Sequence, residues 1–245
     1  MGKGTIHIGT SGWHYKHWIG TFYPEGTKND EQLAYYLQRF KTVEVNNPFY
    51  RIPSPETFRS WAKAVPSDFL FSIKGNRWVT HLKKLKVPAS DMDYFFEGVN
   101  QMGKKAGPIL FQLPPRWNVN AERLKDFLEI LPKNHRFTLE FRDPTWYRDE
   151  VYALLEERNC AFCIYELGGH KSPEAISADF VYVRLHGPEG KYQGKYSIAT
   201  LKKWAKKCLS WQNAGKDVFV YFDNDEAGYA PANARRLAEL TNATK

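Results

Sequence analysis

The chain repeats one pattern: a short apolar run, a polar turn, and a segment whose apolar residues recur at helical spacing. Apolar runs of this length, bounded by turn residues, are typical of buried strands. Such runs occur at residues 5–9, 42–46, 69–74, 108–113, 137–142, 161–166, 180–186 and 218–223. The sequence therefore predicts eight strands, each followed by a helical connection.

Local signals mark where several of these helices begin. Ser54 followed by Pro55, and Ser197 after a glycine-containing loop, are residue types preferred at helix starts. The link from Gly168 to Asp179 differs, because it contains Gly and Pro and shows little helical period. We expect a degenerate helix in that link, between the sixth and seventh predicted strands.

Eight strands alternating with helices in 245 residues match the size of an α/β protein of the (β/α)₈ TIM-barrel class. We predict a single TIM-barrel domain over residues 1–245. A doubly wound open sheet is the main alternative. No strand is followed by G-x-G-x-x-G, and no G-x-x-x-x-G-K-[ST] occurs, so the nucleotide-binding motifs expected of that alternative are missing.

Strand alternation separates two faces and gives the first indication of a site. In the fifth strand, Leu139 and Phe141 face one way, whereas Glu140 and Arg142 face the other, and Asp143-Pro144 ends the strand. The apolar face is expected to pack on helices. Polar residues then gather at the carboxyl ends of the strands, where TIM barrels place their active sites.

Two glutamates, Glu44 and Glu140, are the candidate proton carriers, because a carboxylate near a cation can serve as acid or base. The remaining polar positions form a cationic and amide-rich wall suited to a phosphate or carboxylate. These anion-binding candidates are Asn46, Lys74, His81, Gln112, Arg142, Arg184 and His186. The alternative is a structural network of ion pairs without chemistry.

A divalent metal is a minority hypothesis, with Glu140, Glu166, His186 and Asp223 as its ligands. No fixed-spacing motif such as H-E-x-x-H supports it, and the nearby Arg and Lys residues would repel a cation. We therefore predict no cofactor. The three cysteines include a C-x-x-C at Cys160 and Cys163, which lies in a strand and lacks further zinc ligands, so we expect buried thiols.

Aromatic residues make up 16% of the chain, more than a core alone needs. We predict an aromatic rim at the strand ends that can stack on bases or sugars, formed by Trp13, Tyr15, Tyr50 and Trp146. The alternative is that loops are packed by their own aromatic residues.

The net charge of the chain indicates which classes of binding partner to expect. The chain has 35 Lys and Arg against 27 Asp and Glu, a formal net charge of +8, which favours an anionic small molecule and leaves nucleic acid open. Lys202, Lys203, Lys206 and Lys207 also fit a plain solvated helix face. With no apolar run that could span a membrane and no signal-peptide segment, we expect a cytoplasmic protein without a membrane partner. Oligomeric state stays open.

Several motifs together resemble the YecE-like family, Domain of Unknown Function 72. They are Gly9-Thr10-Ser11-Gly12-Trp13, Thr42-Val43-Glu44 with Asn46, Thr80-His81, Phe111-Gln112-Leu113-Pro114-Pro115, Glu140-Phe141-Arg142 and Tyr182-Val183-Arg184 with His186-Gly187. The resemblance spans nearly the whole chain and implies a TIM barrel without an assigned reaction. It also implies similarity to xylose-isomerase-like and endonuclease IV barrels. Asn224 fits the family pattern as a site residue, whereas Asp223 departs from the usual asparagine pair.

These observations support two hypotheses. The first is an enzyme that acts on a phosphate- or carboxylate-bearing substrate by acid/base chemistry, with Glu44 and Glu140 moving protons. The second is a nucleic-acid-binding protein or phosphoesterase resembling endonuclease IV-type barrels, with or without a metal. Steep loss of affinity with salt is the expected signature of the second.

Overall fold

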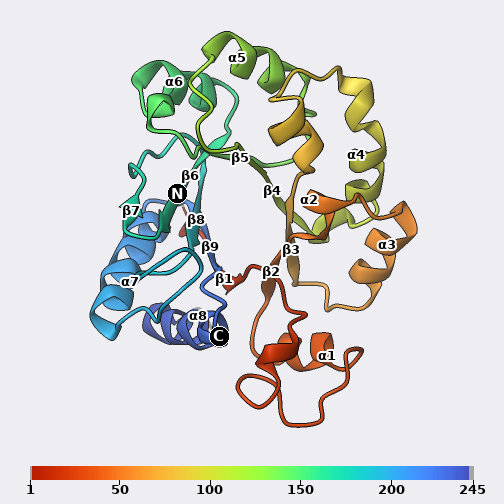
Figure 1. Ribbon diagram of the computed structural model, residues 1–245, viewed down its shortest axis with the longest axis vertical. Coiled ribbons are helices and arrows are strands. Elements are labelled where there is room, and N and C mark those ends of the chain that lie inside the picture. The colour runs from red at the N-terminus through yellow and green to blue at the C-terminus, as the bar shows by residue number, and fades with distance from the viewer. Residues whose placement is uncertain (1, 243–245) are drawn as a thin grey trace. The chain divides into compact units, whose positions relative to one another are not determined.

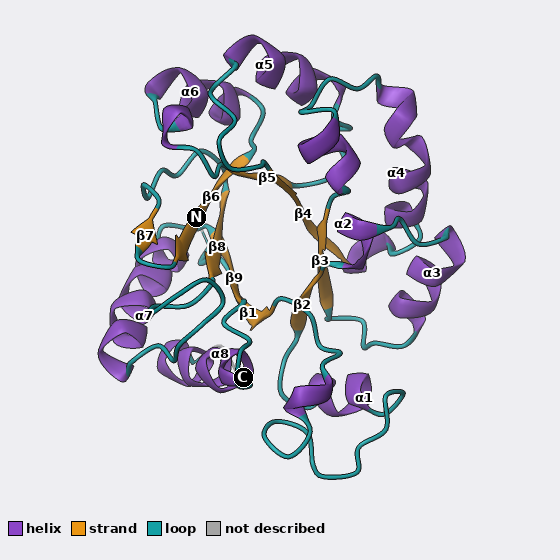
Figure 2. Cartoon of the chain, viewed as in Figure 1, coloured by secondary structure: helices purple, strands orange, loops and turns teal. Residues whose placement is uncertain are grey.

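The computed structural model describes residues 2–242, and the strands alternate with helices along this part of the chain (Figures 1 and 2). The long strands coincide with the predicted ones to within two residues at either end. They are β1 (Ile6–Thr10), β2 (Thr42–Val45), β3 (Leu70–Lys74), β4 (Ala106–Gln112), β5 (Phe137–Glu140), β6 (Ala161–Leu167), β8 (Phe180–Leu185) and β9 (Asp217–Phe222).

The strand order is that of a barrel. Hydrogen-bonded neighbours follow the path β1-β9-β8-β6-β5-β4-β3-β2. The register within β1/β9, β8/β9, β3/β4, β4/β5 and β5/β6 is parallel in each case. A parallel bridge from Ser11 to Glu44 joins the two ends of the path, because Ser11 follows β1 and Glu44 belongs to β2. The predicted TIM-barrel fold class is confirmed.

The connections are mostly α-helical, as predicted, with short 3₁₀ or π segments between. The α-helices are α1 (Gln32–Leu37), α2 (Asn47–Tyr50), α3 (Pro55–Lys63), α4 (Asp93–Asn100), α5 (Ala121–Ile130), α6 (Asp149–Glu157), α7 (Ile198–Asn213) and α8 (Tyr229–Thr241). The short segments are η1 (Lys16–Trp18), η2 (Trp78–Leu82), η3 (Ala89–Met92), η4 (Gly103–Lys105) and η5 (Pro144–Trp146). Ser197 caps α7 by accepting a hydrogen bond from the backbone N–H of Thr200, and Pro55 begins α3.

One connection was predicted wrongly. The link after β6 contains no helix within the described residues. Gly168 (φ +54°) and Gly169 (φ +85°) form a tight turn instead. The turn leads into β7 (His170–Lys171), which pairs antiparallel with the end of β6. Two consecutive glycines with positive φ favour a two-residue hairpin over a helix.

The chain divides into two compact units. Within the described residues, unit 1 holds 2–44, 164–174 and 179–242, and unit 2 holds 45–163 and 175–178. In unit 1, α7 packs beside α8, and α8 packs against β1 and β9. In unit 2, Phe111 of β4 contacts Phe95 of α4 and Phe127 of α5, so the apolar face of that strand meets the helices as predicted.

None of the helices within residues 2–242 combines the length and the apolar composition needed to cross a membrane.

Candidate functional site

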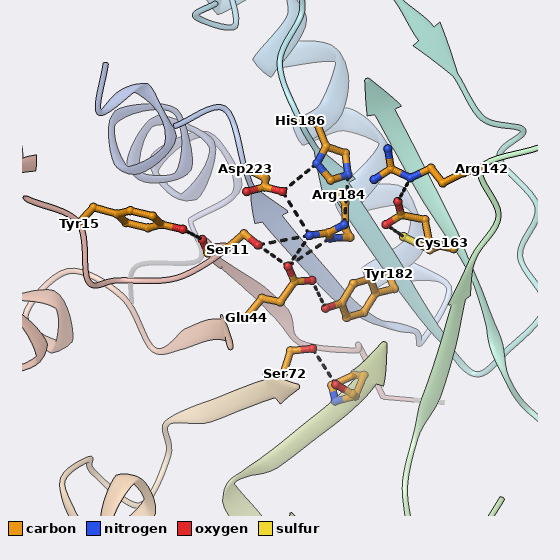
Figure 3. Close-up of polar contacts among 12 residues, drawn as sticks. Ser11, Tyr15, Glu44, Ser72, Arg142, Cys163, Tyr182, Arg184, His186 and Asp223 are labelled. Carbon is orange, nitrogen blue, oxygen red and sulfur yellow. Dashed lines mark hydrogen bonds and ion pairs between the residues drawn. The ribbon is translucent and has the colours of Figure 1, made fainter. Parts of the chain in front are cut away.

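Unit 1 contains a buried charged group that we call the Glu44 cluster: Glu44, Arg184, His186 and Asp223 (Figure 3). Glu44 Oε1 accepts hydrogen bonds from Arg184 Nη2 at 2.7 Å and Nε at 3.2 Å. The carboxylate also accepts from the Ser11 hydroxyl and, at 2.7 Å, from the Tyr182 hydroxyl. Glu44 and Arg184 are 0% and 1% exposed. Both oxygens of Glu44 are therefore already bonded within the protein.

The other half of the cluster joins a histidine to a carboxylate. Arg184 Nη2 lies 3.3 Å from Asp223 Oδ2, and His186 Nδ1 lies 2.9 Å from the same oxygen. Arg184 Nη1 lies 3.3 Å from His186 Nε2. Because a guanidinium only donates, Nε2 accepts and Nδ1 carries the proton that is donated to Asp223. Asp223, with 15% of its side chain exposed, is the member of the cluster that reaches solvent.

Strand periodicity explains how the cluster forms. Tyr182, Arg184 and His186 are two residues apart along and just beyond β8, so their side chains share one face. Leu185 pairs with Phe222 of β9, which brings Asp223 next to His186. Burial without partners would cost each ion several kcal/mol (order of magnitude), and mutual pairing offsets that cost.

Unit 2 contains a second charged group, which we call the Lys74 cluster: Lys74, Arg77, His81, Glu140 and Arg142. Arg142 Nε donates to Glu140 Oε1, and Cys163 Sγ lies 3.7 Å from Glu140 Oε2 (Figure 3). The glutamate is fully buried, whereas the Arg142 side chain is 7% exposed. Glu140 and Arg142, which strand alternation places on one face, therefore form an ion pair at the end of this strand.

The register of unit 2 aligns the other polar residues with Glu140. Gln112 pairs with Glu140, and Leu110 pairs with Lys74. Residues paired in register point to the same side of a sheet, and Leu110 and Gln112 share one parity. Lys74, Gln112 and Glu140 therefore lie on one face of this sheet.

The pKa of His81 reflects the charged groups around its ring. The pKa of His81 lies below its ordinary value, first because the ring is partly buried and then because Lys74, Arg77 and Arg142 repel a proton on it. Lys74 Nζ lies 4.3 Å from the centre of the Phe49 ring, and the His81 ring meets the same phenylalanine edge-on at 5.2 Å. Three cations thus act on one histidine beside an aromatic surface.

Not every predicted residue belongs to these clusters. The Asn224 side chain donates to Gly194 O and to Asn233 Oδ1, both at 2.9 Å, so it holds a loop together inside unit 1. The Gln112 amide donates to Leu113 O at 3.4 Å. Asn46 lies at the N-cap position of α2. The contacts of Asn224 and Gln112 are thus made to neighbouring groups of the protein.

The predicted aromatic rim is only partly exposed. Trp146 is buried, stacks on Phe141 with ring centres 4.9 Å apart, and donates through Nε1 to Trp117 O. The prediction that Trp146 lies on an exposed rim is therefore wrong. The packing alternative holds for this residue, because a tryptophan that stacks in a core no longer faces solvent. By contrast, Tyr50 is 71% exposed.

Trp13 and Tyr15 are intermediate in exposure. The Tyr15 hydroxyl donates to Ser11 O, and the Trp13 carbonyl accepts from Tyr23.

Some of the residues that make these polar contacts were not predicted as site residues from the sequence. Ser11 and Tyr182 both bond Glu44, and the alternation that selected Arg184 also selects Tyr182. Asp225 was missed as well: it accepts from Trp18 Nε1 and lies 3.1 Å from His17 Nε2. Burial raises the pKa of Asp225 to about 6, against opposing contributions from Trp18 and His17.

The metal hypothesis finds no arrangement to support it. Among the described residues, no group of three or more His, Cys, Asp or Glu side chains is placed to hold an ion. His186 contacts Asp223, whereas Glu166 lies 3.4 Å from Lys171. The three cysteines are buried thiols outside any disulfide, as predicted, and burial raises the pKa of the Cys208 thiol to about 12.

Comparison with known proteins places the chain in a family. UPF0759 protein YunF of Bacillus subtilis (strain 168) is 26% identical over 276 residues, covering 96% of this chain and 94% of that protein. The crystal structure of a DUF72 family protein from Thermotoga maritima MSB8 matches with a TM-score of 0.87 and 28% identity, over 97% of this chain and 99% of that one.

A DUF72 family protein from Enterococcus faecalis V583 shares the fold, with a TM-score of 0.83 and 18% identity over 97% of this chain and 96% of that one. The family described as "Protein of unknown function DUF72" matches residues 7–245. The resemblance inferred from the motifs is confirmed, and the chain belongs to the DUF72 family.

Proposed function

We propose that this protein is an enzyme that binds an anionic small molecule, bearing a phosphate or carboxylate, at the Lys74 cluster and moves a proton on it with Glu140. The observation that carries the proposal is the charge around His81: Lys74, Arg77 and Arg142 all oppose its protonation. Three positive charges therefore act on this one imidazole. A bound anion would counteract their effect on it.

The chemistry of each residue suits a separate task. Arg142 presents a planar fork of donors to a carboxylate or phosphate, and Lys74 supplies a compact charge. Glu140 lies beside Arg142, so a substrate held by that arginine would bring its acidic or basic atoms near the carboxylate. His81 would gain a proton more readily once an anion is bound, because the anion counteracts the three cations.

The Glu44 cluster is a weaker anion site. Arg184 already bonds Glu44 and lies 3.3 Å from Asp223, so its charge is shared between two carboxylates. Within our proposal Glu44 is a positioning residue that fixes Arg184, and not the proton carrier expected from the sequence. The proposal includes no cofactor and a cytoplasmic location.

The first experiment measures binding of inorganic phosphate by isothermal titration calorimetry at low ionic strength. Replacing Lys74 by Gln should weaken binding about tenfold, the expected loss of one charge-assisted contact. Lys202→Gln is the matched control, since that lysine lies on the exposed face of α7, and it should bind as the wild type does. Equal affinities in all three proteins would refute the site.

A second experiment addresses catalysis and the nucleic-acid alternative. In an assay of phosphate esters and hydroxycarboxylates, Glu140→Gln should remove turnover of any substrate found while leaving phosphate binding in place. Binding of a labelled single-stranded oligonucleotide is measured alongside at rising salt. Affinity that falls steeply with salt, together with normal turnover in Glu140→Gln, would favour the nucleic-acid function over ours.

A further inference from the structure

A cavity of about 360 Å³ opens in unit 2 on the helix side of the sheet. Phe111 of β4 lies in its wall, and the ring of Phe111 contacts Phe95 of α4, which lines the same cavity. Gln112, the next residue along β4, lies on the opposite face of the sheet together with Lys74 and Glu140. The cavity therefore lies on the other side of the sheet from these polar residues.

The walls of the cavity are mostly apolar and aromatic. They include Ile52, Trp78, Val79, Tyr94, Phe95 and Phe111. Phe95 and Phe111 are almost fully buried, whereas Tyr94 is half exposed, so the wall meets solvent at Tyr94. A dry cavity of about 150 Å³ is enough to hold benzene. This cavity is larger, and it has room for a ring with a short side chain.

The cavity wall carries a negative charge. Among the described residues that line it, Asp91 of η3 is the only charged one, and Asp91 is exposed. The wall also includes Asn76, whose amide is bonded within the protein: Oδ1 accepts from the Trp78 N–H at 2.8 Å, and Nδ2 donates to Pro48 O at 2.7 Å. The Asp91 carboxylate is thus the group best suited to bind the polar end of a ligand.

The aromatic rings favour the same sign of ligand charge as Asp91 does. The face of an aromatic ring is its negative part, and it attracts a cation. Lys83 Nζ lies 5.2 Å from the centre of the Trp78 ring, so the protein already makes one such contact there. Because like charges repel, a ligand cation would lie at Asp91 and not over the ring face that Lys83 occupies.

We propose that this cavity binds a small organic cation, an amine or a quaternary ammonium ion that carries an aromatic or branched aliphatic group. The apolar group fills the cavity, and the ammonium group lies against Asp91. The inference goes beyond the proposed function, because it assigns a second ligand of opposite charge to a different site. A larger cavity of about 560 Å³ beside α5 shows no such preference, since Lys86 and Arg123 line it together with Glu122 and Asp126.

The test titrates the protein with 2-phenylethylamine, which is a cation at neutral pH, and with 2-phenylethanol, which has nearly the same shape without the charge. Two-dimensional NMR of the backbone amides measures both affinities, and the amides that shift should belong to η2 and α4. The amine should bind about fivefold more tightly than the alcohol, the expected gain from one contact of a cation with an exposed carboxylate or ring. Phenylacetate, an anion, should bind more weakly than the alcohol.

Two pairs of variants locate the charge and the cavity. Asp91→Asn should lower the affinity of the amine to that of the alcohol, whereas Asp93→Asn is the matched control, since Asp93 is exposed and does not line the cavity. Ile52→Trp fills the cavity and should weaken both probes by about tenfold or more. Its control is Ile198→Trp, because Ile198 is 45% exposed at the start of α7, and this variant should bind both probes as the wild type does.

Three results would overturn the inference: equal affinities for amine and alcohol in the wild type, a preference that survives Asp91→Asn, or no binding of either probe. Unchanged binding in Ile52→Trp would overturn it as well. Should Ile52→Trp not fold, Tyr94→Ala removes a half-exposed wall instead, and unchanged binding there counts in the same way. Lys74→Gln should bind the amine as the wild type does, so this inference and the proposed function succeed or fail separately.

Discussion

The Glu44 cluster and the Lys74 cluster both contain glutamate, arginine and histidine, but these residues make different contacts in the two clusters. In the Glu44 cluster one guanidinium lies between two carboxylates, and the histidine bonds one of them. In the Lys74 cluster three cations act on one histidine, and Glu140 bonds Arg142. The Glu44 cluster as defined has one guanidinium and two carboxylates, and the Lys74 cluster has three cations and one carboxylate. The two clusters therefore differ in which sign of charge predominates.

A guanidinium bonded between buried carboxylates predicts a structural role, whereas several cations around one histidine predict an anionic ligand. A buried network of hydrogen-bonded charges holds strand ends in place and becomes costly when one partner is removed. A cluster of cations that repel one another gains from an anion. The predictions below begin with the largest expected effect on stability.

The largest effect should follow Arg184→Leu. Removing the guanidinium leaves Glu44 buried and without its cation, which should lower the free energy of unfolding by about 3–5 kcal/mol. Urea denaturation monitored by circular dichroism measures it. The double variant Glu44→Leu, Arg184→Leu should be less destabilised than the single one, because no buried charge is then left unpaired.

The control for this prediction is Arg235→Leu. Arg235 is 63% exposed and lies 3.8 Å from Glu239, so its loss should change stability by less than about 0.5 kcal/mol. If Arg184→Leu were as mild as Arg235→Leu, the Glu44 cluster would not be a structural network.

Lys74→Gln should behave in the opposite way to Arg184→Leu. Removing one of three neighbouring cations relieves repulsion, so the free energy of unfolding should change by less than about 1 kcal/mol even though Lys74 is largely buried. The same urea experiment measures it, at low salt where repulsion is strongest. A loss as large as that of Arg184→Leu would show that Lys74 also belongs to a structural network of buried charges.

The buried carboxyl of Asp225 should make the stability of the protein depend on pH in the acidic range. Because folding raises the pKa of this carboxyl to about 6, the folded state binds a proton more tightly than the unfolded state. Stability from this group is present below about pH 4 and is lost as the pH rises through about 6, by on the order of 1–3 kcal/mol. Asp225→Asn should remove that pH-dependent loss in thermal unfolding measured from pH 4 to 7.

The contradicting result for Asp225 is a variant whose stability varies with pH as steeply as that of the wild type. Such a result would assign the dependence to other carboxyls. Asparagine retains an oxygen that accepts from Trp18, so the hydrogen bond itself is conserved in this test.

The smallest effect concerns His81. Its pKa is lowered in the folded state, so its contribution to stability is present above about pH 6.5 and is lost as the pH falls through the folded-state pKa. His81→Gln should remove this dependence. Phosphate should raise the pKa of His81, which two-dimensional NMR of the imidazole would detect. A pKa that does not change with phosphate would count against the Lys74 cluster as the anion site.

Prediction from sequence succeeded where one physical signal decided the outcome. Strand alternation placed Glu140 with Arg142 and Arg184 with His186 on shared faces, and cap residues located the starts of α3 and α7. Prediction failed where side-chain packing determined whether a residue is buried or exposed. Trp146 follows a strand end as a rim residue would, yet its indole stacks on Phe141 inside unit 2. A degenerate helix was predicted for the link after β6, whereas the left-handed backbone of Gly168 and Gly169 forms a hairpin turn there.

The sequence by itself determined the fold class, the order of the elements and the face on which each charged residue lies, because these follow from periodicities of two and 3.6 residues along the chain. Only the tertiary structure decided which charges meet. Glu44 and Arg184 are 140 positions apart, and their pairing depends on strand register and loop closure, which no local pattern encodes. The same long-range contacts decided that Arg184 lies between two carboxylates and that three cations act on His81.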